Sequence, residues 1–268
     1  MSRVLIVSNR LPITVRTDTG DLRVERSTGG LATGLKSGHE DGGGLWIGWP
    51  GTSGALSDAQ RRVLAERCAA LRVAPVALSD EEVEQYYEGF CNGALWPLFH
   101  SFPSQLPLET TGFGRYREVN QRFAEATARH YRPGDRVWVH DYQLMLVPRM
   151  LRELIPEATV GFFLHIPFPS PDLFRTLPSR EALLDGLLGA DLVGVHTASY
   201  MRNFAASVLH VLGASADVDR ITWQGRVTNL GVYPWPATHN GASYAAGDSI
   251  LWSPDELLAG RLEAQDDA

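Results

Sequence analysis

The chain has 268 residues, 44% of them hydrophobic and 21% charged, which suits a soluble globular protein of one large or two small domains. Its net charge of −7 argues against a protein that coats nucleic acid. Its longest apolar runs, such as 160–164, are far shorter than the ~20 residues of a membrane-spanning helix. Two cysteines, Cys68 and Cys91, make neither a disulfide scaffold nor a zinc motif, and no secretory leader follows Met1. We therefore expect a cytoplasmic protein with no metal and with neither membrane nor nucleic acid as a partner.

Short apolar runs alternate along the chain with segments of helical periodicity. The first run, at 4–7, is apolar on both faces, as expected of a central parallel strand. Ser79 and Glu82 have the spacing of a capping box at the start of a helix. The predicted strands are 4–7, 73–78, 136–140, 159–166 and 191–195, and the predicted helices are 58–71, 79–87, 116–131, 144–155, 180–188 and 199–212. This alternation predicts an α/β fold with a doubly wound parallel sheet.

The alternation stops near residue 234. The stretch 235–268 has few β-branched residues and ends in an acidic, polar segment. We therefore divide the chain into one α/β domain at 1–234 and a divergent tail at 235–268, which we expect to pack weakly.

Several polar residues lie where predicted strands lead into loops, which is where open α/β sheets bind ligands. Arg10 follows the first strand and could bind a phosphate through two N–H groups, but a solvated loop arginine fits equally well. Gly29 and Gly30 open a helix whose backbone N–H groups could face a phosphate, and a simple glycine turn explains them too. Each of these two signals is weak by itself.

Tyr87 and Trp96 belong to an aromatic segment that we expect at a helix end and in the loop after it. Such a segment usually packs in the hydrophobic core, although aromatic faces with polar edges can also form a sugar-binding wall. Asp141 follows the strand 136–140 and could bind a sugar hydroxyl or cap the next helix. His165 lies among apolar residues, where a core role is more common, but its place at a strand end favours a functional role.

Taken together and in this order, these segments resemble the trehalose-6-phosphate synthases, glycosyltransferase family 20, which are retaining enzymes of the GT-B type. The resemblance extends over residues 3–233. Its densest parts are 7–12, 29–35, 45–51, 86–100, 116–120, 138–144 and 161–169.

The resemblance implies that residues 1–234 are the Rossmann-like, acceptor-binding half of a GT-B enzyme, and that 235–268 replace the expected donor-binding domain. It implies transfer of glucose from a nucleoside diphosphate glucose, UDP-glucose by preference, to glucose 6-phosphate in trehalose biosynthesis, without a metal or other cofactor. The residues that match the family's acceptor site are Arg10 for the phosphate and Tyr87, Trp96 and Asp141 for the sugar.

The resemblance also implies donor contacts. Gly29 and Gly30 match the glycine turn near the donor diphosphate, and His165 matches a contact to the donor glucose. Asp141 and His165 would then be the two groups at the reacting atoms, with Asp141 positioning the acceptor rather than acting as a nucleophile.

Other readings stay open. The family's Arg-Leu-Asp-Tyr-Xaa-Lys-Gly donor segment has no counterpart after Tyr233, so we expect a truncated form with little activity alone and an open surface that favours self-association. Relatives with another acceptor include the glucosylglycerol-phosphate synthases and enzymes that join pseudo-sugars. A non-catalytic module that binds a sugar phosphate is the alternative from another class.

Overall fold

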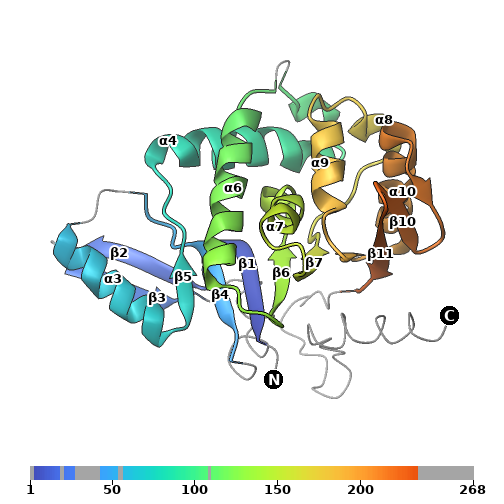
Figure 1. Ribbon diagram of the computed structural model, residues 1–268. Helices are drawn as coiled ribbons and strands as arrows, with labels where there is room; N and C mark the ends of the chain where they lie inside the picture. The colour runs from blue at the N-terminus through green and yellow to red at the C-terminus, as the bar shows by residue number, and fades with distance from the viewer. Residues whose placement is uncertain (1–2, 19–20, 28–42, 54–56, 108–109, 235–268) are drawn as a thin grey trace, which may run out of the picture.

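The computed structural model describes residues 3–18, 21–27, 43–53, 57–107 and 110–234. They form an α/β fold around a nine-stranded sheet of order β5-β4-β1-β6-β7-β8-β11-β10-β9, which confirms the predicted fold class (Figure 1). Neighbouring strands from β5 to β11 are parallel, and β10 and β9 add an antiparallel edge. The strands are β1 (Val4–Arg10), β4 (Leu45–Trp49), β5 (Val73–Pro75), β6 (Arg136–His140), β7 (Thr159–Phe163), β8 (Leu192–Val195), β9 (Ser215–Ala216), β10 (Arg220–Trp223) and β11 (Arg226–Val232).

Helices connect the parallel strands and cover the sheet. In Figure 1, α6, α7 and α9 lie in front of the central strands, and α3 lies beside a separate two-stranded hairpin, β2 (Ile13–Asp18) and β3 (Asp21–Arg26). The helices are α3 (Asp58–Ala70), α4 (Asp80–Glu82), the π-helix η1 (Val83–Leu95), α5 (Trp96–Phe99), η2 (Pro103–Gln105), α6 (Phe113–His130), η3 (Tyr142–Leu144), α7 (Val147–Leu154), α8 (Pro171–Phe174), α9 (Arg180–Leu187) and α10 (Ala198–Leu212). Within the described ranges, none of them combines the length and the apolar character that crossing a membrane requires.

Strand β1 explains how both faces of the sheet become buried. Leu5 and Val7 belong to the large core cluster formed with η1, α6, α7, α9 and α10. Val4 and Ile6 point to the opposite face and join a smaller cluster with α3 and the hairpin. Successive side chains of a strand alternate between faces, so a continuous apolar run requires cover on both sides. The run at 4–7 predicted this arrangement correctly.

The element boundaries differ from the prediction at several places. The predicted strands 73–78 and 159–166 end earlier, at Pro75 and Phe163. The strands β2, β3, β4, β10 and β11 were not predicted, because short or half-polar runs give a weak periodic signal. The predicted helix 79–87 is also too short, since it continues as η1 and α5, so Trp96 lies on the same helical segment as Tyr87 and not in the loop expected after it.

Gly189 offers a test of the contact between the end of α9 and the start of α7. A Cβ at Gly189 would lie 2.3 Å from both the backbone N and the Cα of Arg149, and neither atom can rotate away. We expect Gly189→Ala to lower the free energy of unfolding by at least about 1–3 kcal/mol, measured by urea denaturation.

Gly114→Ala is the matched control for that substitution. An added Cβ at Gly114, in the first turn of α6, meets nothing within 4 Å. It should leave stability unchanged or raise it by up to about 1 kcal/mol. Equal effects of the two substitutions would contradict the close packing at Gly189.

Candidate active site

The candidate site lies at the carboxyl ends of the central parallel strands. Because β1, β6, β7 and β8 are neighbours in one parallel series, their carboxyl ends meet at one edge of the sheet. Arg10 is the last residue of β1, Asp141 follows β6 directly, and His165 lies two residues beyond β7. A fourth polar residue, His196, directly follows β8.

Arg10 is exposed and stacks on an aromatic ring. Its Cζ lies 4.8 Å from the centroid of the Trp49 ring. The guanidinium also lies against Gly51, where φ is +84° and an added Cβ would come within 2.1 Å of Nη2. Among the described residues, no carboxylate forms an ion pair with Arg10. The residue therefore presents a fixed positive charge that an anion can neutralise.

Tyr87 and Trp96 both lie on the helical segment η1–α5. The ring of Tyr87 is 6.1 Å from that of Trp49, so Tyr87 and Arg10 share one neighbour. Trp96 is 38% exposed and stacks on His100 at a centroid distance of 4.1 Å. The structure thus brings Arg10 and Tyr87 together, while Trp96 is farther along the segment, where its ring packs against His100 and Phe102.

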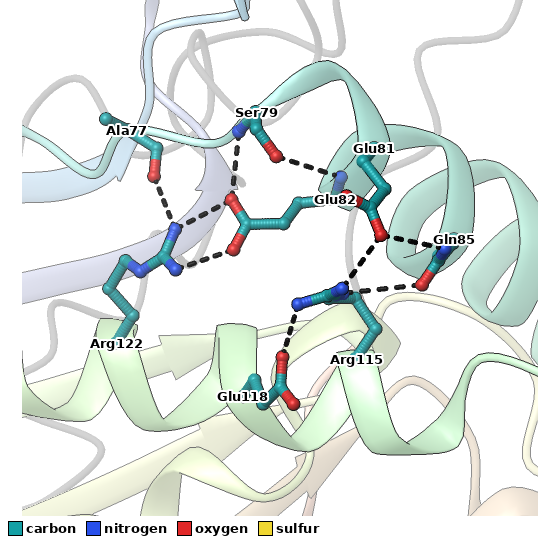
Figure 2. Close-up of polar contacts among 8 residues, drawn as sticks. All are labelled: Ala77, Ser79, Glu81, Glu82, Gln85, Arg115, Glu118 and Arg122. Carbon is teal, nitrogen blue, oxygen red and sulfur yellow. Dashed lines mark hydrogen bonds and ion pairs between the residues drawn. The ribbon is translucent and has the colours of Figure 1, made fainter.

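Figure 2 shows how the start of this segment is fixed to α6. Ser79 and Glu82 form the predicted capping box, with Ser79 N donating to Glu82 Oε2 at 2.9 Å and Glu82 N donating to Ser79 Oγ at 3.2 Å. The guanidinium of Arg122 donates to both carboxylate oxygens of buried Glu82, at 2.6 and 2.8 Å, and to Ala77 O. The Arg122 hydrogen bonds hold the pKa of Glu82 below its ordinary value.

Buried polar side chains form hydrogen bonds with the backbone of the loop after β6. The hydroxyl of Tyr116 donates to Tyr142 O at 2.8 Å and accepts from Met145 N at 3.0 Å. Asn120, on the same face of α6, donates to Gln143 O at 3.0 Å. These bonds satisfy the loop backbone where no regular helix or strand does so.

Asp141 is held in a strained backbone conformation with φ 73° and ψ 168°. Such a conformation costs about 1–3 kcal/mol and occurs where the surrounding structure enforces it. Its own N–H donates to Phe163 O at 2.8 Å, and its Oδ1 accepts from Tyr142 N at 3.0 Å and from His165 N at 3.1 Å. Asp141 therefore caps the short turn η3 and not α7, the helix that was predicted to begin near Leu144, and it also joins β6 to His165.

Burial raises the pKa of Asp141 to about 6, although the two backbone N–H donors partly oppose the shift. Among the described residues, none donates a hydrogen bond to its Oδ2. The carboxylate thus keeps one oxygen able to accept a hydrogen bond from a ligand.

Three histidines lie side by side at the ends of β6, β7 and β8. Nδ1 of His140 and Nε2 of His165 are 3.0 Å apart, and the rings of His165 and His196 are 5.8 Å apart. Burial lowers the pKa of His165 to about 3 and that of His140 well below its usual value, so both rings are neutral. In the part of the chain that the structure describes, no group of three or more His, Cys, Asp or Glu side chains is arranged to hold a metal ion.

Not every predicted site residue can be located. Gly29 and Gly30, the predicted donor-diphosphate turn, lie outside the described residues. No role was predicted from the sequence for Trp49, Gly51, His140 or His196. The rule that pointed to Asp141, a polar residue directly after an apolar strand, would also have found His196.

The Arg122–Glu82 pair should contribute far more to stability than the exposed pairs beside it. Glu82 is buried, so Arg122→Met would leave a buried carboxylate without its partner and should cost about 1–3 kcal/mol in urea denaturation.

Arg115→Met is the matched control in the same network (Figure 2). Arg115 pairs with exposed Glu81 and Glu118 at 3.0 and 2.6 Å, and exposed pairs contribute about 0–1 kcal/mol. A larger loss for Arg115→Met than for Arg122→Met would contradict this ranking.

Asp141→Asn should stabilise the protein at alkaline pH. Because the pKa of Asp141 is raised to about 6, the favourable effect of its proton is present at low pH and is lost as the pH rises through 6. The amide avoids the buried charge, so we expect a gain of about 1–3 kcal/mol near pH 8 that disappears below about pH 4. Urea denaturation at both pH values measures it, and a variant less stable than the parent near pH 8 would show that the charge itself is needed for folding.

Comparison with known proteins identifies the family. The model of glycosyltransferase family 20 matches residues 2–237. The chain is 46% identical over 243 residues to the bifunctional trehalose-6-phosphate synthase/phosphatase of Thermoproteus tenax, covering 87% of this chain and 32% of the relative. It is 41% identical over 239 residues to the UDP-forming alpha,alpha-trehalose-phosphate synthase 1 of Aspergillus niger, with coverage of 87% and 46%.

A solved structure agrees with these sequence matches. The UDP-forming alpha,alpha-trehalose-phosphate synthase of Burkholderia xenovorans in complex with glucose-6-phosphate superposes with a TM-score of 0.69 at 30% identity, over 87% of this chain and 49% of that one. The chain thus spans half or less of the length of these proteins. Since the family model matches well over half of the chain, the predicted resemblance is confirmed, and the chain belongs to glycosyltransferase family 20.

Proposed function

We propose that residues 1–234 form the acceptor-binding part of a UDP-forming trehalose-phosphate synthase, which transfers glucose from UDP-glucose to glucose 6-phosphate. The observation that carries the proposal is that Arg10, an exposed cation stacked on Trp49, and Asp141 lie at the carboxyl ends of two neighbouring parallel strands, β1 and β6. One group suits a phosphate and the other a sugar hydroxyl. Relatives named for this reaction, and the related structure solved with glucose-6-phosphate, support the choice of substrates.

Each site residue has a role in this proposal. Arg10 neutralises the acceptor phosphate, Tyr87 and Trp96 form the wall beside the sugar, and Oδ2 of Asp141 accepts a hydrogen bond from a sugar hydroxyl. His165 lies beside Asp141, joined to it through its backbone N–H, and contacts the glucose of the donor. Because the pKa of His165 is lowered by burial, the ring stays neutral and acts as a hydrogen-bonding group, not as a cation.

The reaction itself needs no covalent bond to the protein. The acceptor hydroxyl oxygen forms a bond to the anomeric carbon, the bond from that carbon to the diphosphate breaks, and the hydroxyl proton passes to the leaving diphosphate. The described residues contribute by holding the acceptor at the right place, which can supply several kcal/mol of the barrier reduction. Gly29 and Gly30 are proposed to face the diphosphate.

The proposal also covers the location, the self-association and the cofactor requirement of the protein. The protein works in the cytoplasm, self-associates, and uses neither a metal nor another cofactor. Arg10 would serve any phosphorylated acceptor, so glycerol 3-phosphate is the second candidate, and a binding module without turnover is the third.

Arg10→Ala should weaken binding of glucose 6-phosphate and leave binding of glucose unchanged. A hydrogen bond to a charged group contributes about 1.5–3 kcal/mol, so we expect a loss of about ten- to a hundredfold, measured by titration calorimetry. Arg62→Ala is the control, because Arg62 is also exposed but lies on α3, and this substitution should change neither affinity.

The same titrations separate the alternatives. Equal losses for both sugars would remove Arg10 from the phosphate site. Stronger binding of glycerol 3-phosphate than of glucose 6-phosphate by the parent chain would favour the other acceptor, and binding of neither would overturn the proposal.

A further inference from the structure

His140 is a buried residue that the proposed reaction does not use. It is fully buried at the end of β6, and its ring lies 4.7 Å from that of Trp138 and 5.2 Å from that of His165. Its Nδ1 is 3.0 Å from Nε2 of His165, whereas its own Nε2 is buried without a hydrogen-bond partner in the part of the chain described. The two ring nitrogens of His140 are therefore in unequal surroundings.

These unequal surroundings determine which of the two histidine rings donates the hydrogen bond between them. A neutral imidazole has one N–H and one lone pair, so the bond needs the proton either on Nδ1 of His140 or on Nε2 of His165. In the second case the proton of His140 would sit on Nε2, as a buried N–H group with no acceptor. Orphaned buried N–H groups are rarer in proteins than under-satisfied acceptors. The favoured arrangement has His140 donating from Nδ1 and leaving only a lone pair on its Nε2.

The backbone of His165 is fixed independently of this bond. Its N–H donates to Oδ1 of Asp141 at 3.1 Å, and its backbone forms a hydrogen bond with the ring of His196. Phe163 packs against the His165 ring at 4.7 Å. These contacts fix the position of the backbone and of the ring.

We propose that His140 is a positioning residue for His165, which it holds in the tautomer with the proton on Nδ1 and the lone pair on Nε2. A free imidazole prefers the proton on Nε2, so the protein must impose the other form, and the hydrogen bond to one nitrogen decides the state of the second. His165 then offers an N–H from Nδ1, able to donate to a sugar hydroxyl oxygen. Only the contact between this N–H and a sugar hydroxyl rests on the proposed function; the tautomer itself does not.

Nitrogen NMR of the histidine rings in the whole 268-residue chain at neutral pH tests the proposal. Protonated and unprotonated ring nitrogens resonate far apart, and His165→Gln assigns the signals of His165 by their loss. We expect the proton on Nδ1 of His165 in the parent chain. His140→Phe keeps an aromatic ring but removes the hydrogen-bond donor. In this variant we expect the proton of His165 on Nε2, so that Nε2 gives the signal of a protonated nitrogen and Nδ1 that of an unprotonated one.

His140→Asn is the conservative variant, because its amide nitrogen can stand where Nδ1 stood and restore the donor. It should keep the proton of His165 on Nδ1, and so should His210→Asn, a control on the exposed face of α10. A merely structural role for His140 would not produce this difference between Phe and Asn.

Two results would overturn the proposal: a parent chain with the proton of His165 on Nε2, or a His140→Phe variant with unchanged signals. The spectrum of the parent chain tests the first of these results even if His140→Phe does not fold. Neither result depends on substrate binding, so a failure of the proposed function, seen with Arg10→Ala, is recognised separately.

Discussion

The parallel ladder between β6 and β7 is the constraint on which the candidate site depends. It pairs His140 with Phe163 and continues as the bond from Asp141 N to Phe163 O. Asp141, directly after this ladder, has a backbone conformation that a residue with a side chain rarely adopts, and its Oδ1 accepts a hydrogen bond from the backbone N–H of His165. Hydrogen bonds from its own N–H and to its Oδ1 thus hold Asp141 between β6 and the residues that follow β7.

The site is divided electrostatically into two parts. At the end of β1, Arg10 is exposed and charged, and its guanidinium stacks on the Trp49 ring. At the ends of β6 and β7, burial favours neutral forms, which raises the pKa of Asp141 and lowers the pKa of His140 and His165. In the proposed function, this division would place the acceptor phosphate at β1 and the uncharged sugar hydroxyls at the neutral rings.

The wall of the site depends on a different kind of contact. The segment η1–α5 carries Tyr87 and Trp96, and its first turn is fixed by the two-pronged bond between Arg122 and Glu82 (Figure 2). Farther along, the Tyr86 hydroxyl donates to Asn9 Oδ1 at 3.0 Å, and Tyr142 donates to Asn92 Oδ1 at 2.9 Å. The helical segment is thus joined to β1 itself and to the turn that follows β6.

The sequence by itself determined the alternation of strands and helices, the burial of β1 on both faces and the family. These follow from local patterns: apolar runs, helical periodicity and motifs in order. It also placed Arg10, Asp141 and His165 at strand ends, because the position of a residue after an apolar run can be read directly.

Only the tertiary structure decided the rest. The π-helical continuation of η1, the strained φ of Asp141 and the neighbours of His140 all depend on contacts between residues far apart in the chain. His140 and His165 are 25 positions apart, and no periodicity relates them. Their pairing, and with it the tautomer and the shifted pKa values, arises when parallel strands bring their ends to one edge and the surrounding core removes water.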